Sequence, residues 1–398
     1  MNGIAPDDFT RAIRPDPNSK GLLFAGTEAH LYISYDDGGH WSLFQANLPA
    51  VPITDIAFQK REDDLVISTQ GRGFYVLNDL PLVRALAPGK TSHGEVHLFA
   101  PKPAYRYADG GGSGRTPAGV GANPPNGVVV FYSLGDGAAP AIKLRFLDAS
   151  GKLLKEFSSK SGPEAAAPAV EGEERAPAVK LPTQAGLNRF VWDMRYNDAI
   201  GFPGLILWAS NLRGPLAVPG TYTAELEANG KTERQQFEIR KDPRATTSAD
   251  DFSKQLALEL QIRDEISAAN QAVVDIRSER HQLASYTAGD PQVVSEANRI
   301  SAALSDVENA IYQTKLESTK DPLNYPVKLN NKLTSLLNTV STSDAHPTAQ
   351  SYEVFDQLSV QLKEQLDRLQ QINRHDLDGL NSLLRERHLA AIAVGSAK

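Results

Sequence analysis

Residues 34–41, SYDDGGHW, place two aspartates, a histidine and two aromatic side chains within eight positions. Paired carboxylates act as acid and base in glycoside hydrolysis, and histidine transfers protons near neutral pH. Glycoside hydrolysis needs two carboxyl groups about 5 to 9.5 Å apart on either side of one bond, whereas adjacent residues at the end of a strand point in diverging directions. We therefore predict a structural turn here and no catalytic residue.

The spacing of Ser34, Asp36, Gly38 and Trp41 follows the order S-x-D-x-G-x-x-W, which suits a tight turn between two strands. A short aspartate side chain can accept hydrogen bonds from backbone amides of the turn, and glycine adopts positive φ without strain. The tryptophan supplies a large apolar surface, which we expect to pack between neighbouring sheets. All four residues are predicted to serve the fold.

The same spacing resembles the Asp-box of the bacterial neuraminidase (BNR) repeat. The flanking segments LLFAGTEAHLYISYDDGGHW and DLVISTQGRGFYVLNDL resemble the closing blades of bacterial sortilin-like Asp-box β-propeller proteins, which are often labelled glycosyl hydrolase. Further along, LFAPKPAYRY and GLNRFVWDMRY resemble the C-terminal portion of the same proteins. The resemblance implies a secreted, periplasmic or cell-envelope binding scaffold, and it carries over no catalytic residues.

Three other side chains are candidate ligand contacts. Arg72 lies between Gly71 and Gly73, where it forms a strand-to-strand turn or reaches a ligand carboxylate from the rim. Trp192 and Trp208 flank an aromatic-rich segment, which either stacks on sugars or packs in a core. The alternation of FVW with polar residues favours the core.

The remaining candidate motifs do not match known sites. His93 and His97 are four residues apart, but Gly94 occupies the position of the glutamate in H-E-x-x-H. The glycine-rich run at 110–121 lacks G-x-x-x-x-G-K-[ST], and there is no cysteine in the chain. We predict no metal and no cofactor.

The turn lies in a region, residues 1–82, where short apolar runs alternate with glycine, proline and aspartate. Period-2 stretches such as ITDIAFQ and DLVIST predict about seven antiparallel strands. A propeller needs four to eight blades of four strands, so seven strands make fewer than two. The expectation is that this region is the last blades of a truncated Asp-box propeller, and that the chain is the tail of a larger protein; the alternative is that a partner completes the propeller.

Residues 83–240 keep a β texture and predict an immunoglobulin-like β-sandwich. Candidate strands include GVVVFYSL, which we pair with AIKLRFLD, and a hairpin centred on Asn229-Gly230. Two low-complexity loops, at 108–127 and 161–178, are too rich in glycine, proline, alanine and charge to form a core. We expect both loops to be disordered.

Residues 241–398 change to a helical period. Apolar residues recur every three or four positions in four successive segments, which breaks such as Gly289-Asp290-Pro291 and Asp321-Pro322 separate. Thr247-Ser248-Ala249-Asp250 is typical of a helix N-cap. This region is predicted to be an antiparallel helical bundle, which makes the fold class multidomain β plus α.

Composition narrows the range of functions. The chain of 398 residues has a formal net charge of −7, which disfavours a nucleic-acid partner. It shows no signal-peptide pattern at residues 1–20 and no run of 18 apolar residues, so we predict no membrane insertion, while the compartment cannot be derived from the residues. The favoured function is a non-catalytic scaffold for a protein or carbohydrate ligand. The alternative is an accessory C-terminal region of a BNR-type glycoside hydrolase whose active site lies in blades outside this chain.

Overall fold

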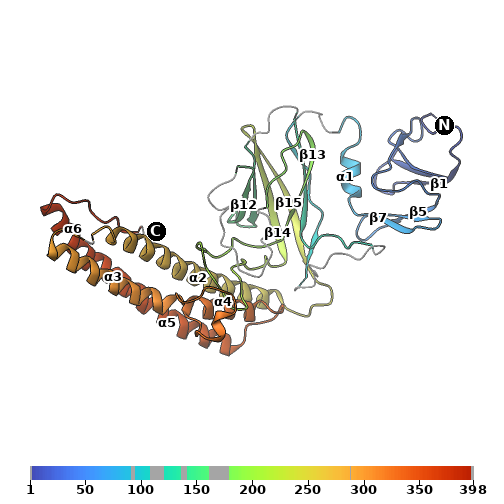
Figure 1. Ribbon diagram of the computed structural model, residues 1–398. Coiled ribbons are helices and arrows are strands. Elements are labelled where there is room, and N and C mark those ends of the chain that lie inside the picture. Colours follow the sequence, from blue (N-terminus) through green and yellow to red (C-terminus); the bar gives the residue numbers. More distant parts are fainter. Residues whose placement is uncertain are drawn as a thin grey trace.

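The computed structural model describes residues 2–90, 95–107, 121–135, 141–160, 179–286 and 288–395. The fold is mixed β plus α, with several sheets followed by a helical C-terminal region. Figure 1 shows three parts in a row: small N-terminal sheets, a larger pair of sheets in the middle, and elongated helices at the other end.

The N-terminal part contains two small antiparallel sheets, formed from seven strands at the segments where period-2 patterns predict them. Each sheet follows chain order, so neighbouring strands are joined by short turns. The first sheet comprises β1 (Thr10–Pro15), β2 (Leu23–Thr27), β3 (Leu31–Ser34) and β4 (Ser42–Leu43). The second comprises β5 (Ile53–Gln59), β6 (Asp64–Thr69) and β7 (Gly73–Leu77).

The two N-terminal sheets pack face to face around one apolar cluster that includes Phe24 and Ile33 from the first sheet and Ile56 and Ile67 from the second. Their approach is close at Gly26, where a Cβ would lie 2.4 Å from Cγ2 of Ile53. A side chain at position 26 would therefore force the sheets apart.

Helix α1 (Leu80–Ala85) anchors the chain to both N-terminal sheets through Arg84. The Arg84 guanidinium binds the buried carboxylate of Asp16, at 2.9 Å, and also the carboxylate of Asp63. The hydrogen bond from Arg84 lowers the pKa of Asp63. One cation therefore holds the end of β1, the β5–β6 turn and α1 together.

The middle part contains a three-stranded and a five-stranded sheet. The order of the first is β13-β10-β8, and that of the second is β12-β11-β14-β15-β9. Their strands are β8 (His97–Leu98), β9 (Ala104–Arg106), β10 (Val128–Leu134), β11 (Lys143–Asp148), β12 (Leu153–Ser158), β13 (Gly186–Trp192), β14 (Gly220–Ala228) and β15 (Lys231–Lys241).

The predicted pairing of GVVVFYSL with AIKLRFLD is wrong, because β10 and β11 belong to different sheets. β10 pairs with β13, which is more than fifty residues further along the chain, and β11 pairs with β12 and β14. Non-local pairing of this kind leaves no signal in a single sequence. The predicted hairpin is present: β14 and β15 are joined by Asn229 and Gly230, both at positive φ.

The two middle sheets share an apolar core to which Tyr132 and Trp192 contribute from the smaller sheet and Phe146 and Phe237 from the larger. The rings of Trp192 and Phe146 stack with their centroids 4.2 Å apart. Residues 108–120 and 161–178, most of the two predicted loops, lie outside the described residues.

The C-terminal region is built from long helices that pack around a common core. They are α2 (Ala249–Leu283), α3 (Pro291–Ile311), α4 (Leu329–Val340), α5 (Ala349–Gln371) and α6 (Asp378–Glu386). A 3-10 turn, η2 (Asp321–Leu323), precedes α4, and a π-helical segment, η3 (Ile372–Leu377), joins α5 to α6. The N-cap is the predicted one: the Ser248 hydroxyl accepts a hydrogen bond from the amide of Asp251.

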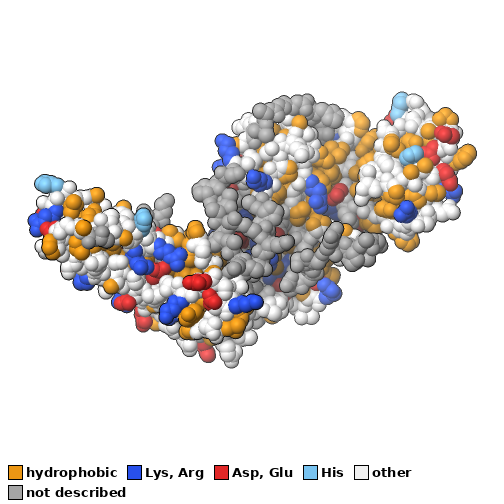
Figure 2. All heavy atoms as spheres, in the orientation of Figure 1, with side chains coloured by type: hydrophobic (Ala, Val, Ile, Leu, Met, Phe, Trp, Pro, Cys, Tyr) orange, Lys and Arg blue, Asp and Glu red, His pale blue; other side chains and the backbone are white. Residues whose placement is uncertain are grey.

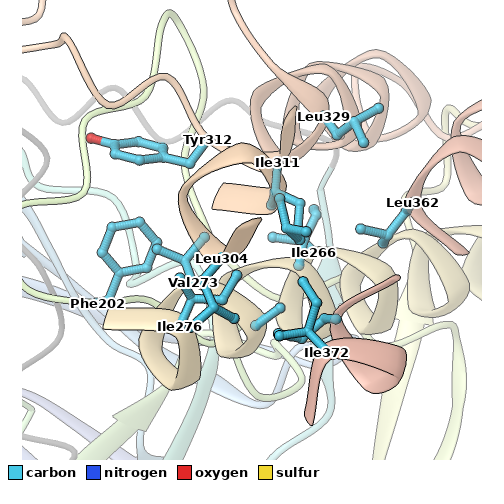
Figure 3. Close-up of a cluster of buried hydrophobic side chains, with 14 of the residues drawn as sticks. Phe202, Ile266, Val273, Ile276, Leu304, Ile311, Tyr312, Leu329, Leu362 and Ile372 are labelled. Atoms are coloured by element: carbon cyan, nitrogen blue, oxygen red, sulfur yellow. The ribbon is translucent and has the colours of Figure 1, made fainter. Parts of the chain in front are cut away.

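The helical core also takes in side chains from the middle part of the sequence. Phe202, Leu205 and Leu207 lie in the same cluster as Ile276 and Tyr312. Figure 3 shows Phe202 beside Tyr312 and Val273, and the two aromatic rings meet edge to face at 5.2 Å. A boundary at residue 240 therefore does not separate the core of the sandwich from that of the helices.

Candidate functional site

The S-x-D-x-G-x-x-W turn joins β3 to β4 and is closed by its own side chains. The Ser34 hydroxyl donates to Oδ1 of Asp36 at 2.8 Å and accepts from the amide of Gly38 at 3.0 Å. The His40 amide donates to Oδ1 of Asp36 at 2.8 Å, and Nδ1 of His40 lies 2.6 Å from Oδ2. Asp37 and Gly38 have positive φ, as the tight turn requires.

These contacts decide what Asp36 can do. The hydrogen bonds from the His40 side chain, the His40 amide and the Ser34 hydroxyl lower the pKa of Asp36 to about 2. A carboxylate that stays ionised and has both oxygens occupied is a poor general acid and a poor nucleophile. The geometry of Asp36 is that of a turn-forming residue.

Trp41 is buried, but not between the two N-terminal sheets. It packs with Ala25 and Tyr32, which point away from the β5–β7 sheet because they alternate with Phe24 and Ile33. Residues 2–9 cover this side of the sheet: the Trp41 amide donates to the carbonyl of Asn2 at 2.9 Å. Trp41 was expected to pack between neighbouring sheets, and this is wrong for the two N-terminal sheets: the ring packs on the other face of the first sheet.

The opposite end of the N-terminal part presents a mostly apolar sheet face, and no other sheet among the described residues packs against it. We call it the outer face; it is formed across β5, β6 and β7 by Asp55, Ala57, Val66, Ser68, Phe74 and Val76. Phe74 and Val76 are 77% and 53% exposed, although both are large and apolar. In Figure 1, β5 and β7 lie at the margin of the N-terminal part, on the side away from most of the first sheet.

The inner face of the same sheet has a different environment. Ile56, Ile67 and Tyr75 form one cross-strand row and belong to the N-terminal core. β7 pairs with β6 alone among the described strands, so one of its edges is open. The segment GFYVL carries apolar residues in both phases of the strand period, a pattern typical of strands buried on both faces. That pattern is the sequence signal by which the outer face could have been found.

The structure separates the three candidate ligand contacts. Trp192 is 0% exposed, so the ligand-contact role considered for it is wrong and the core alternative holds. Trp208 is 39% exposed and packs by the helices, where its amide donates to Oδ1 of Asn331 on α4. Arg72 is exposed in the β6–β7 turn and has no ion pair with any described residue. Trp192 and Trp208 therefore do not form one aromatic platform.

A polar junction that the sequence did not indicate joins the middle sheets to the helices. The guanidinium of Arg106 binds Oδ1 of Asp344 at 2.7 Å and the carbonyls of Leu216 and Ala217 at 2.9 and 3.1 Å. It also lies over the ring of Phe252, 5.0 Å from its centroid. Arg106 comes from β9 and Phe252 from α2, so this contact fixes the helices against the sandwich.

A buried carboxylate, Glu259 on α2, belongs to the same junction. Its Oε1 accepts a hydrogen bond from the Ser341 hydroxyl at 2.8 Å, while Oε2 has no partner among the described residues. Burial raises the pKa of Glu259. An open recess of about 460 Å³ adjoins the junction. The charged side chains that line it are already paired: Arg244 binds Asp242, and Asp344 binds Arg106 of the junction.

The described ranges contain neither a candidate metal site nor a candidate membrane-spanning helix. No group of three or more histidine, aspartate or glutamate side chains there is placed to hold a metal ion. His97 is 3.2 Å from Oε2 of Glu233, and His93 lies outside the described residues. None of the helices described combines the length and the apolar character needed to cross a bilayer.

On the face seen in Figure 2, basic and acidic side chains are interspersed.

Comparisons with known proteins give no family. No protein-family model matches the chain, and no curated protein matches it. Among solved structures, it is similar to the extracellular domain of a protein assigned as a hybrid two-component system from B. thetaiotaomicron, at 12% identity and a TM-score of 0.15. The match covers 60% of this chain and 26% of that one. A TM-score so low carries no argument about fold or function.

Proposed function

We propose that the chain is a non-catalytic binding scaffold, and that it is the C-terminal portion of a larger sortilin-like Asp-box β-propeller protein. In this proposal β1–β4 form one blade and β5–β7 belong to the next. The single observation that carries the proposal is the outer face, where Phe74 and Val76 are exposed on a sheet whose other face packs in the N-terminal core.

The arrangement of the strands supports the blade assignment. A propeller blade is a four-stranded antiparallel sheet that packs face to face on its neighbours. The first N-terminal sheet has four strands in chain order, and the second stacks on it with three. The free edge of β7 is available to a fourth strand, and the outer face is available to a further blade.

The middle sheets support the finer assignment of an immunoglobulin-like sandwich. Two sheets enclose one core, and a tryptophan packs at its centre against Phe146. The ligand in this proposal is a protein or a carbohydrate. Arg72 and Trp208 stay candidate contacts for it, and the resemblance points to a secreted, periplasmic or cell-envelope location.

The paired contacts of Asp36 argue against a catalytic role for Asp36 itself. Its carboxylate serves the turn, and it stays ionised over the pH range in which glycosidases need a protonated acid. The alternative, an accessory region of a BNR-type glycoside hydrolase, places all catalysis outside this chain.

Two measurements test the proposal. Hydrogen exchange of the β7 amides is compared between this chain and a longer protein that contains the sequence encoded upstream; we expect the amides to be slower in the longer protein, because a further strand and blade cover them. Both proteins are also assayed on a panel of glycosides, and we expect no turnover. Equal exchange rates would reject the blade assignment, and turnover by the longer protein would favour the hydrolase alternative.

A further inference from the structure

The segment after α6 returns along the helices and is held by their side chains. We call residues 388–395 the tail segment. Figure 1 shows the chain leaving α6 and running back beside α2. Gln282 donates to the carbonyl of Ala393 at 3.0 Å and accepts from its amide at 2.7 Å. Asn381 makes the same pair of bonds with Ile392, at 3.0 and 2.7 Å.

The side-chain amides of Gln282 and Asn381 therefore form paired hydrogen bonds with the backbones of two consecutive residues, from opposite sides of the segment. In extended chain, the N–H and C=O of one residue point to one side and those of the next residue to the other. α6 supplies Asn381 on one side, and α2 supplies Gln282 on the other. Main-chain hydrogen bonds along an extended segment are one of the ways in which proteins bind peptides.

Side-chain recognition in the tail segment is limited to two positions. Ile392 is 4% exposed and belongs to the helical core, whereas its neighbours Ala391 and Ala393 are exposed. At Gly395 a Cβ would lie 2.5 Å from Cγ of Asp275, so only glycine fits without a shift. The contacts thus select an aliphatic residue followed, three positions later, by glycine.

The tail segment fills this site incompletely. The amide of Gly395 donates to Oε1 of Glu279 at 3.2 Å, and Nδ2 of Asn373 donates to the same oxygen at 3.1 Å. Oε2 of Glu279 and Oδ1 of Asn373 are buried, with no partner among the described residues. Unpaired buried polar atoms destabilise a structure, so a ligand that offers partners to them binds better than the tail segment does.

The connection between α6 and the tail segment is strained. His388 has a φ of +58°, and the amide of Leu389 donates to the carbonyl of Leu384 at 2.8 Å. This is the hydrogen bond of a helix end whose left-handed position is usually glycine. A histidine at this position costs conformational energy that glycine would not.

We propose that Gln282, Asn381, Glu279 and the pocket of Ile392 form a binding site for an extended peptide with an aliphatic-x-x-Gly pattern, and that the tail segment occupies this site in cis. The site lies on the helices and does not depend on the blades or on the outer face. Failure of the peptide to bind would leave the proposed function untouched.

The linkage in cis sets the expected size of the competition. A segment on a short connection has an effective concentration of about 1 mM, so a peptide with its own dissociation constant of about 0.1 mM binds the unaltered chain roughly tenfold more weakly than a chain whose tail segment is released. Ile392→Asp releases the tail segment by placing a charge in the apolar pocket. Ala391→Asp is the matched control, because it adds the same charge at an exposed neighbour.

The test uses the full chain and a fluorescent, end-capped peptide with the sequence LAAIAVG of residues 389–395. We expect saturable binding to Ile392→Asp that is about tenfold tighter than to the unaltered chain and to Ala391→Asp. Asn381→Leu in the Ile392→Asp chain should lose at least tenfold of this binding, and a peptide with aspartate in place of its isoleucine should not bind. Ala393→Pro, which removes the amide that binds Gln282, is a second way to release the tail segment if Ile392→Asp unfolds.

Hydrogen exchange at residues 392 and 393 reports whether the tail segment is released, and circular dichroism reports whether the helices stay intact. Intact helices with a released tail segment and no peptide binding would overturn the proposal. Peptide binding that is unaffected by Asn381→Leu would overturn it as well, and so would amides that stay protected in both release variants.

Discussion

Replacement of Phe74 and Val76 by serine is expected to leave the stability of the chain unchanged and to weaken its association with other sheets. Both side chains are mostly exposed, at 77% and 53%, so their loss should change the free energy of unfolding by less than about 0.5 kcal/mol. When a sheet covers the outer face, burial of the exposed parts of Phe74 and Val76 contributes about 2 to 3 kcal/mol in total. That is a factor of about 30 to 150 in the dissociation constant.

Two assays separate these effects. Urea unfolding gives the stability, and sedimentation velocity over a range of concentrations gives the self-association that an open apolar sheet favours. Ile67→Ser is the matched control: Ile67 lies on the inner face of the same sheet and is buried. Its replacement should cost about 2 to 5 kcal/mol of stability. The reasoning fails if the double variant loses as much stability as Ile67→Ser, or if it associates as strongly as the unaltered chain.

Four further variants test other parts of the structure. Asp36→Ala should lower the melting temperature, because three hydrogen bonds of the turn are lost, without changing activity on any glycoside; a glycosidase activity that disappears with it would contradict the turn assignment. Trp192→Ala should cost about 3 to 5 kcal/mol in a melting experiment and leave carbohydrate binding unchanged in the folded protein, since the ring is buried in the sandwich. Burial raises the pKa of Glu259 above 4.5, so the folded protein keeps a proton that the unfolded chain releases, and the free energy of unfolding falls as pH rises from 4.5 towards the folded pKa. Glu259→Gln does not titrate, so its free energy of unfolding, measured by urea titration, should rise relative to that of the unaltered chain over this pH range. Parallel pH profiles of the two proteins would refute this. Arg84 lowers the pKa of Asp63 below 3.8, so the stabilisation from this pair is present above 3.8 and is lost as pH falls through the folded pKa; Arg84→Met should cost about 3 to 5 kcal/mol near pH 7, because it leaves the buried Asp16 unpaired, and the difference should narrow in acid.

Local sequence patterns predicted the strands and helices, because the formation of each element depends on a few neighbouring residues. The period-2 runs of the N-terminal part, the Asn229-Gly230 hairpin and the Ser248 cap are of this kind. The turn contacts of Asp36 also follow from residues within six positions of one another.

Contacts between segments that are far apart in the sequence could not be predicted from such local patterns. The pairing of β10 with β13 depends on the shape of the whole sandwich, and the sequence alone led to the wrong partner. The position of Phe202 in the helical core and the ion pair of Arg106 with Asp344 join residues that are far apart in sequence. An arginine in a short strand is usually solvated, so its residue type gives no sign that it pairs with Asp344, in a loop more than two hundred residues later.

The rate at which a thiol at position 74 is labelled tests the central claim most directly. The chain has no cysteine, so Phe74→Cys introduces a single reactive group on the outer face. We expect rapid labelling in this chain and at least a hundredfold slower labelling in a longer protein that contains the upstream sequence, with the buried Ile67→Cys slow in both. If Phe74→Cys is labelled at the same rate in the two proteins, no further blade covers the outer face, and the assignment of these sheets to a larger propeller is contradicted.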